Sequence, residues 1–350
     1  MLLDVCRAAL RSTSVETVTV FCSKSGERAF DLPADPRMRV VEPRLLTSRG
    51  PLRLVWHLGG LSAAARAARV DTLLCLAGVG ASSSGPDAVT FIQQSLPFCP
   101  EALSRCSRHV RARLLVLEAS MRRSCQNSRA VIVQTPTMMR WVRDQFHVPT
   151  NRLIAILPAA TAEAAADIRT PALDKMRTVP AGSRLLYVGT NAPYKNLPVA
   201  VGAMRRIRAA HPGATLFVTL PKGALEEPGI ECLGYLSELE LDQAYRLTTV
   251  LVMPSLVETV GLPLIEALAR GVPILAADRP YAHDVCGDAA AYFDPLSANS
   301  FVASVLQLLG DEKPRTQLSE RALKLAQQRE SSRPYDEMIR LVLDRTRSRA

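Results

Sequence analysis

Two glutamates, Glu258 and Glu266, lie eight positions apart and are the residues of this chain best suited to binding a polar ligand. Between them the sequence reads Gly-Leu-Pro (261–263) and then becomes apolar. Pro263 suits the first turn of a helix, where a backbone N–H is not needed, and Gly261 lets the backbone approach a ligand closely. Free N–H groups at a helix start attract anions. The stretch therefore predicts a pocket that offers amide donors to phosphate oxygens and carboxylates to hydroxyl groups.

A nucleotide sugar carries both kinds of group, because its diphosphate joins two hydroxylated rings. The alternative is that Glu258 is a solvated loop residue and that Glu266 merely favours the first turns of a helix. On the two glutamates alone, the sequence leaves both interpretations open.

The elements that must position these glutamates are short apolar runs that alternate with helical segments. Runs that are apolar throughout are typical of a parallel sheet covered by helices on both faces. Ligands of such sheets bind at the carboxyl ends of the strands, and Glu258 follows the run VLVM at 250–253. Ser237 and Glu240 form a capping box that opens a helix. We expect strands at 184–189, 214–220, 230–235, 250–253, 272–277 and 290–294, with helices at 197–211, 238–247, 263–270 and 297–310.

The N-terminal half also predicts an α/β arrangement, although its pattern is less regular. The chain begins with the helix-like MLLDVCRAALRS, so we expect an N-terminal domain without its first strand. Strands are expected at 15–22, 37–43, 70–78, 88–94 and 129–135, with helices at 52–68 and 112–126.

Three segments are expected from these patterns. They are an N-terminal domain at 1–165, a C-terminal domain at 166–335 and a helical tail at 336–350. The link between the domains is placed near 158–172, which is rich in small residues and lacks periodicity. Two further helices are expected at 316–330 and 335–346.

The stretch from Pro254 to Pro295 resembles the donor-binding core of glycosyltransferase family 4, the retaining GT-B enzymes of glycosyl transferases group 1. Glu258 and Glu266 match its E-x7-E signature. The run VGTNAPYKN (188–196) resembles the family's first glycine loop, and LGYLSELELDQAY (233–245) resembles its base-side segment. The resemblance implies two Rossmann-like domains that face a cleft. It also implies transfer of a sugar from a nucleotide-sugar donor to a glycan or lipid-linked acceptor, in cell-surface polysaccharide synthesis.

The same resemblance implies a role for each matching residue. Lys195 contacts the donor diphosphate, and Glu258 accepts hydrogen bonds from hydroxyls of the donor sugar; these two are the expected catalytic residues. Glu266 holds the ribose hydroxyls. The remaining donor-binding residues are Gly189, Thr190, Gly234, Tyr235, Val260, Gly261 and Leu262, of which Gly234 and Tyr235 border the base. The alternatives are a surface lysine for Lys195 and ordinary packing for Tyr235.

The implied chemistry is a front-face substitution with retention of configuration. No carboxylate stands out as a nucleophile for double displacement. The resemblance implies that the leaving phosphate takes the acceptor's proton, so that catalysis rests on orientation and on stabilising the diphosphate. No D-x-D motif follows a strand, and we expect a hexosyltransferase-type enzyme that needs neither metal nor cofactor.

The sequence departs from the family pattern at two further places. Where many members carry a histidine after the fourth N-terminal strand, this chain has Gln93 and Gln94, which we expect on the acceptor side. Thr190 stands where members often have an arginine, and Arg184 is not expected to replace that charge. A non-catalytic GT-B-like binding protein and a nucleotide-sugar epimerase of the same fold therefore remain alternatives.

The formal net charge of +10 suggests an anionic partner. Seven arginines and one glutamate lie in residues 104–129, with Leu114, Leu115 and Leu117 among them. Such a segment could rest on an anionic membrane, with a solvated helix that buries an apolar stripe as the alternative. Nucleic acid is not expected, because aromatic residues are scarce in this segment.

The remaining features indicate a cytoplasmic protein, with a peripheral position on the inner membrane face as a second option. We see no secretory signal and no apolar run of membrane-spanning length. The eight cysteines are scattered, which favours buried thiols over disulfides or a zinc site. His283 is expected in a surface loop.

Overall fold

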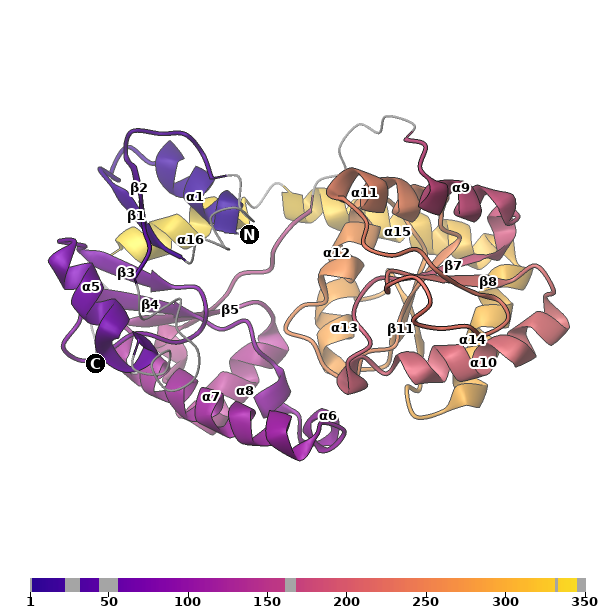
Figure 1. Ribbon diagram of the computed structural model, residues 1–350, viewed down its shortest axis with the longest axis horizontal. Coiled ribbons are helices and arrows are strands. Elements are labelled where there is room, and N and C mark those ends of the chain that lie inside the picture. The colour runs from indigo at the N-terminus through magenta and orange to yellow at the C-terminus, as the bar shows by residue number, and fades with distance from the viewer. Residues whose placement is uncertain (1, 23–31, 44–55, 161–167, 331–332, 345–350) are drawn as a thin grey trace. The chain divides into compact units, whose positions relative to one another are not determined.

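The computed structural model describes residues 2–22, 32–43, 56–160, 168–330 and 333–344. The chain packs as two compact units (Figure 1). The N-terminal unit comprises Met1–Phe98, Arg108–Pro158 and Ser332–Ala350, and the C-terminal unit comprises Cys99–Ser107 and Ala159–Ser331. The expected boundary at 165 stays a prediction, but a short piece from the first half of the sequence packs with the C-terminal unit.

The C-terminal unit is built on a six-stranded sheet in which every pairing is parallel. Its strand order is β12-β11-β10-β7-β8-β9, which is the order 3-2-1-4-5-6 of a doubly wound domain read from the other edge. The predicted doubly wound fold is therefore confirmed for this half. The strands are β7 (Arg184–Tyr187), β8 (Thr215–Val218), β9 (Ile230–Cys232), β10 (Val250–Met253), β11 (Ile274–Ala277) and β12 (Ala291–Phe293).

Helices cover both faces of this sheet, as Figure 1 shows. The sheet grows in opposite directions from β7, and right-handed crossovers therefore place the connecting helices on opposite faces. One face carries α10 and α14, which pack on each other and on β7 and β8 in one apolar cluster. The helices are α9 (Pro171–Thr178), α10 (Leu197–Ala210), α11 (Glu238–Leu247), α12 (Leu262–Ala269), α13 (Pro280–Cys286), α14 (Ala298–Gly310) and α15 (Glu312–Glu330). A short helix from the first half of the sequence, α6 (Pro100–Ser104), belongs to the same unit.

Local sequence signals account for most of these helix starts. The predicted capping box of α11 is present, since the Ser237 side chain accepts from the Glu240 N–H and the Glu240 carboxylate accepts from the Ser237 N–H. Thr170 accepts from the Leu173 N–H at the start of α9, a helix that the sequence analysis missed. Helix α13 was also missed: His283 lies in this helix and not in a loop. Its side chain is half exposed, pairs with Asp278 and stacks on Tyr292.

The N-terminal unit contains two separate parallel sheets within the described residues. The first is the pair β1–β2 and the second has the order β3-β4-β5-β6, with no pairing between β1 and β3. The strands are β1 (Val18–Phe21), β2 (Met38–Val41), β3 (Thr72–Cys75), β4 (Asp87–Phe91), β5 (Ala130–Val133) and β6 (Leu153–Ala155), of which β6 was not predicted.

The first element of this unit is a helix, as the sequence pattern predicts. Part of the helix expected at 52–68 lies outside the described residues; what remains is a π-helical turn at Trp56–Gly60 that continues into α5. The last helix of the chain packs against the first one in the core of this unit. The helices are α1 (Leu2–Arg11), α5 (Leu61–Ala67), α7 (Arg108–Asn127), α8 (Pro136–Phe146) and α16 (Pro334–Leu343).

Candidate functional site

The candidate site lies where the sheet of the C-terminal unit changes its direction of growth. Strands β7 and β10 are neighbours there, and each is followed by a loop and a helix on the opposite face from the other. Such a switch point leaves room for a ligand at the carboxyl ends of the two strands. The loop after β7 carries Lys195, and the loop after β10 carries Glu258. A hydrogen bond of 2.9 Å from the Leu256 N–H to the Tyr194 carbonyl joins the two loops.

Lys195 and Glu258 form an ion pair at this point. The distance from Nζ to Oε1 is 2.6 Å, and the exposed fractions of the side chains are 17% and 13%. A surface lysine and a solvated loop glutamate, the two alternative interpretations, are therefore both wrong. The pair places one positive and one negative group at the carboxyl ends of neighbouring strands of the parallel sheet.

Tyrosines surround the ion pair and hold the loops that carry it. The Tyr187 hydroxyl donates to the Thr190 carbonyl at 2.6 Å, and the Tyr281 hydroxyl donates to the Ser255 carbonyl at 2.9 Å. Burial raises the pKa of both hydroxyls, and the charge of Glu258 raises it further. Both phenols are therefore protonated donors at neutral pH. The Gly189 N–H is also engaged, and donates to the Thr219 hydroxyl at 3.0 Å.

Asn196 fixes the backbone directly after Lys195. It has a left-handed conformation with φ of 55°, which asparagine adopts more readily than most residues. Its side chain is buried and spans two other parts of the unit. Nδ2 donates to the Pro295 carbonyl at 2.9 Å, and Oδ1 accepts from Arg105 at 2.8 Å. The turn that presents Lys195 is thus held from several sides.

The start of α12 supplies backbone donors beside the ion pair. Gly261 precedes the helix with φ of 72°, and as the N-cap residue it has no side chain to cap the first turn. This left-handed conformation favours glycine, and an added Cβ would lie 3.2 Å from Met253 Cε, which would then have to shift slightly. The side chain of Val260 is buried, whereas Leu262 is half exposed. At Val260 the backbone is therefore the part that a ligand could reach, and its role in donor binding stays a prediction.

Glu266 lies one turn inside α12 and is held by another tyrosine. The Tyr245 hydroxyl of α11 donates to Oε2 of Glu266 at 2.7 Å. Arg270 donates to the Glu266 carbonyl at 2.8 Å and forms an ion pair of 2.6 Å with Asp242. Glu266 is therefore fixed on its helix by contacts from α11.

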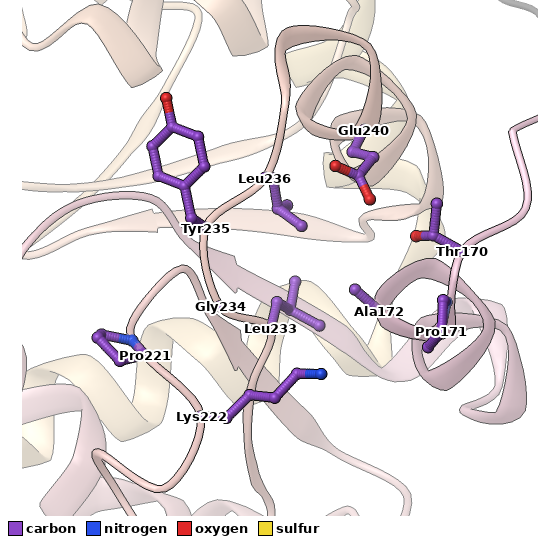
Figure 2. Close-up of a pocket in the computed structure, with 10 residues that line it drawn as sticks. All are labelled: Thr170, Pro171, Ala172, Pro221, Lys222, Leu233, Gly234, Tyr235, Leu236 and Glu240. Atoms are coloured by element: carbon purple, nitrogen blue, oxygen red, sulfur yellow. The ribbon is translucent and has the colours of Figure 1, made fainter.

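Gly234 and Tyr235 line a cavity of about 380 Å³ in the same unit (Figure 2). The Tyr235 side chain is 97% exposed, so ordinary packing, the alternative interpretation, is wrong. An exposed aromatic ring at a cavity rim can stack on a planar ligand. The full lining comprises Thr170, Pro171, Ala172, Pro221, Lys222, Leu233, Gly234, Tyr235, Leu236 and Glu240.

Lys195, Glu258 and Glu266 are not part of this lining. Gln93 and Gln94 belong to the N-terminal unit, where Gln93 donates to the Leu76 carbonyl and Gln94 accepts from the Leu96 N–H. Arg184 is the first residue of β7, and its Nε donates to the Val179 carbonyl. It therefore lies at the opposite end of the strand from Gly189. This position agrees with the expectation that Arg184 does not replace the arginine charge that Thr190 lacks.

The arginine-rich stretch is divided between different environments. Arg129 is 2% exposed and forms an ion pair with Asp87, so it does not belong to a surface patch. Arg105 lies in the C-terminal unit and contacts Asn196. Residues 108–127 of the stretch form α7, on which Leu115 and Val116 are exposed to 62% and 51%.

Two further properties concern metal ions and membranes. The described residues contain no group of three or more His, Cys, Asp or Glu side chains that could hold a metal ion. The helices in the part of the chain that the structure describes are too short or too polar to span a bilayer.

Sequence analysis missed Asn196 and Tyr245 as supporting residues. An asparagine between a loop and a Leu-Pro helix start is a signal for a left-handed turn, and it precedes α10 here. Tyr245 lies at the end of the matched segment 233–245, but its contact with Glu266 crosses from one helix to another. No spacing rule for a single helix could predict that contact.

Residues 221–325 match the family model of glycosyl transferases group 1. Among curated proteins, the O-antigen chain mannosyltransferase B of Escherichia coli is 26% identical over 261 residues. That match covers 68% of this chain and 65% of the mannosyltransferase, so it spans slightly less than two thirds of the relative's length.

Solved structures resemble nearly the whole chain. Sucrose-phosphate synthase from Thermosynechococcus elongatus gives a TM-score of 0.74 at 18% identity and covers 97% of this chain and 90% of its own. Anabaena Alr3699/HepE in complex with UDP-glucose gives 0.72 at 14% identity, with coverage of 97% and 95%. At these identities the likeness shows the fold alone, and it confirms the predicted GT-B fold.

Proposed function

We propose that this chain, whose residues 221–325 match the family model of glycosyl transferases group 1, is a retaining glycosyltransferase. Its donor is a nucleotide sugar, and its acceptor is a glycan or a lipid-linked glycan. The observation that carries this proposal is the Lys195–Glu258 pair at the switch point of the sheet, beside the uncapped start of α12. A diphosphate and a sugar hydroxyl need this combination of a cation, free N–H groups and a carboxylate.

In the proposed reaction, Lys195 leaves its ion pair with Glu258 and binds the donor diphosphate. The ammonium group turns from Glu258 to the diphosphate and stabilises the negative charge that grows as the nucleotide leaves. The freed Glu258 carboxylate accepts a hydrogen bond from a hydroxyl of the donor sugar. The acceptor hydroxyl attacks from the side of the leaving phosphate, which takes its proton, so the configuration at the anomeric carbon is retained.

The donor sugar is proposed to be a hexose, and the reaction to need no metal. The mannosyltransferase relative supports the first point by its name. The second rests on Lys195 and the N–H groups of α12, which supply the positive charge that a metal would otherwise bring. Turnover that survives EDTA would support metal independence, and turnover that Mg²⁺ or Mn²⁺ alone restores would contradict it.

We further propose that α7 rests on an anionic membrane, where a lipid-linked acceptor in cell-surface polysaccharide synthesis would be found. Arg108, Arg111 and Arg113 accompany the exposed Leu115 and Val116 on this helix. Such a helix can insert its apolar residues while its arginines meet lipid phosphates. Flotation with vesicles that contain phosphatidylglycerol tests this: binding that requires the anionic lipid and falls in Leu115→Asp supports it, and equal binding to neutral vesicles contradicts it.

Release of nucleoside diphosphate from a panel of nucleotide sugars tests the transferase proposal itself. We expect turnover with one donor, and a loss of about 100-fold or more in Lys195→Ala and in Glu258→Ala, because each removes a charge from the site. Lys175→Ala is the matched control, since Lys175 pairs with Glu231 in the same unit on an exposed surface. A product with inverted configuration would contradict retention. Tight nucleotide binding without turnover in any acceptor mixture would instead favour the non-catalytic binding protein.

A further inference from the structure

Tyr245 is a buried tyrosine whose hydroxyl has one partner among the described residues, the carboxylate of Glu266. The side chain is 1% exposed, and its hydroxyl donates to Oε2 of Glu266 at 2.7 Å. Burial raises the pKa of Tyr245 well above its ordinary value, and the charge of Glu266 raises it further. The phenol therefore stays protonated and can only donate to the carboxylate.

Further contacts around Tyr245 connect α11 with α12. Arg270 lies over the Tyr245 ring at 5.4 Å, donates to the Glu266 carbonyl, and pairs with Asp242 on the same helix as Tyr245. Asp242 also pairs with Arg246 at 2.8 Å. Helices α11 and α12 are thus held together by charged hydrogen bonds around one tyrosine, and the Glu266 side chain cannot rotate freely without losing its donor.

The contact leaves half of the Glu266 carboxylate available. Within the described ranges, Oε1 of Glu266 accepts no hydrogen bond, whereas Oε2 is occupied by Tyr245. A carboxylate with one oxygen fixed and the other open presents a single, oriented acceptor. A vicinal diol offers hydroxyl donors that such an acceptor can bind.

We propose that Tyr245 is a positioning residue that fixes Glu266 so that its open oxygen meets the ribose hydroxyls of the nucleotide. This rests on the proposed function, since it takes the donor to be a ribonucleotide sugar. Tyr245 itself does not touch the ligand. It favours ribose by keeping one carboxylate oxygen of Glu266 in place. Loss of the Tyr245 hydroxyl should therefore lower the affinity only for ligands that carry the ribose hydroxyls.

The experiment compares the affinity of the full chain for nucleoside diphosphates with and without ribose hydroxyls. UDP, GDP and ADP are titrated by calorimetry, and the tightest of them is compared with its 2′,3′-dideoxy form. In Tyr245→Phe we expect the affinity for the ribonucleotide to fall about tenfold, as for loss of a hydrogen bond to a charged group. The affinity for the dideoxynucleotide should stay within about twofold of the unaltered chain, because the oriented acceptor has no partner there.

A matched control and a double variant exclude a general effect on folding. Tyr292→Phe removes another tyrosine hydroxyl of the same unit, which donates to the Gly287 carbonyl, and should leave both affinities unchanged. In a Glu266→Ala background, Tyr245→Phe should cost no further affinity, because the residue that it positions is gone. Unfolding by urea is measured for each variant.

Each other outcome overturns one proposal or both. Equal losses for ribo- and dideoxynucleotides in Tyr245→Phe would assign it a purely structural role, and no loss for either would also overturn the inference. A selective loss for ribonucleotides in a chain that never turns over a nucleotide sugar would overturn the transferase and leave the positioning role standing. Failure of the unaltered chain to bind any nucleoside diphosphate would overturn both.

Discussion

At the scale of single residues, the Lys195–Glu258 pair concentrates two opposite charges in a place with little water. Taking two charges out of water costs free energy, and their mutual attraction offsets that cost only while both are present. Removing one partner leaves the other without compensation. The pair is therefore expected to matter for stability as well as for ligand binding.

Stability and activity should separate in the double variant of this pair. Lys195→Met should lower the free energy of unfolding by about 2 kcal/mol, because Glu258 is left unpaired at 13% exposure. Adding Glu258→Gln should restore most of that stability and none of the turnover. Urea unfolding and donor turnover measure the two quantities. A double variant as unstable as the single one would show that the charges do not compensate each other.

Gly261 is the second residue at which geometry makes a sharp prediction. Gly261→Ala puts a side chain at φ of 72°, where a Cβ meets Met253 at 3.2 Å and Leu264 at 3.3 Å. We expect a loss of about 1–2 kcal/mol in stability from the left-handed conformation, and a higher KM for the donor because the start of α12 shifts. Gly182→Ala is the control, since nothing lies within 4 Å of its added Cβ and its φ is ordinary. Similar KM values for the two variants would contradict the assigned role of Gly261.

The sequence indicated Lys195, Glu258 and Glu266 as candidates because each follows a recognisable signal along the chain, and their roles stay predictions. It could not predict that Tyr245 donates to Glu266 or that Arg105 reaches Asn196. These contacts join residues 21 and 91 positions apart, and periodicity carries no information about such distances. The sequence also could not predict that the Tyr235 side chain is exposed, because an aromatic residue after a strand is more often packed.

At the scale of elements, strands were easier to predict than short helices. The central strands are apolar runs between turn residues, and β7 and β10 are almost completely buried. Helices α8, α9 and α13 have at most 11 residues and were missed. Their start signals were present in the sequence: proline follows Thr135 and Thr170, and both threonines cap their helices. Strand β6 has three residues, too few for a pattern.

The connection between α11 and α12 should show itself in the acid stability of the chain. Burial alone would raise the pKa of Asp242, but hydrogen bonds and charges from Arg246 and Arg270 lower it below its ordinary value of 3.8. A carboxyl group with a lowered pKa contributes stability above its unfolded-state pKa and loses that contribution as the pH falls through its folded-state pKa. Asp242→Asn should therefore be less stable at pH 7, and the two stability curves should converge below about pH 4.

The measurement is urea unfolding from pH 7 down to the acid transition. Asp288→Asn serves as the control, because the Asp288 side chain is 85% exposed and lies 3.9 Å from Arg321. That variant should follow the unaltered chain at every pH. An Asp242→Asn curve that stays parallel to the unaltered one would mean that Asp242 is not a source of acid sensitivity.

At the scale of the whole molecule, sequence order and spatial grouping differ. Residues 99–107 pack with the C-terminal unit, and residues 333–344 pack with the N-terminal unit. Sequence patterns did not predict either exchange, because hydrophobic periodicity shows that a helix buries a face and not which core receives it. The contacts of α16 identify its core: Met338, Ile339 and Val342 pack with Val5 of α1 and Phe91 of β4.

Arg129 strengthens the attachment of α16 to this unit. Its guanidinium donates to the Leu341 and Asp344 carbonyls at 3.0 and 2.6 Å, and also to the Val342 carbonyl. These are carbonyls at the end of α16 that lack partners within the helix. Arg129, which directly precedes β5, thus caps the C-terminal end of α16. The same side chain forms an ion pair with Asp87 of the neighbouring strand β4.

Both tryptophans of the chain, Trp56 and Trp141, belong to the N-terminal unit, so their fluorescence reports on that unit alone. If α16 is part of its core, Met338→Ala should lower the free energy of unfolding seen by fluorescence by about 3 kcal/mol, because it leaves a cavity where the side chain is 1% exposed. Arg340→Ala, on the exposed face of the same helix, should change it by less than about 0.5 kcal/mol. Affinity for nucleoside diphosphate, which we propose belongs to the other unit, should stay unchanged in both variants. A Met338→Ala variant with an unaltered fluorescence transition would show that the last helix is not part of the core that contains α1 and β4.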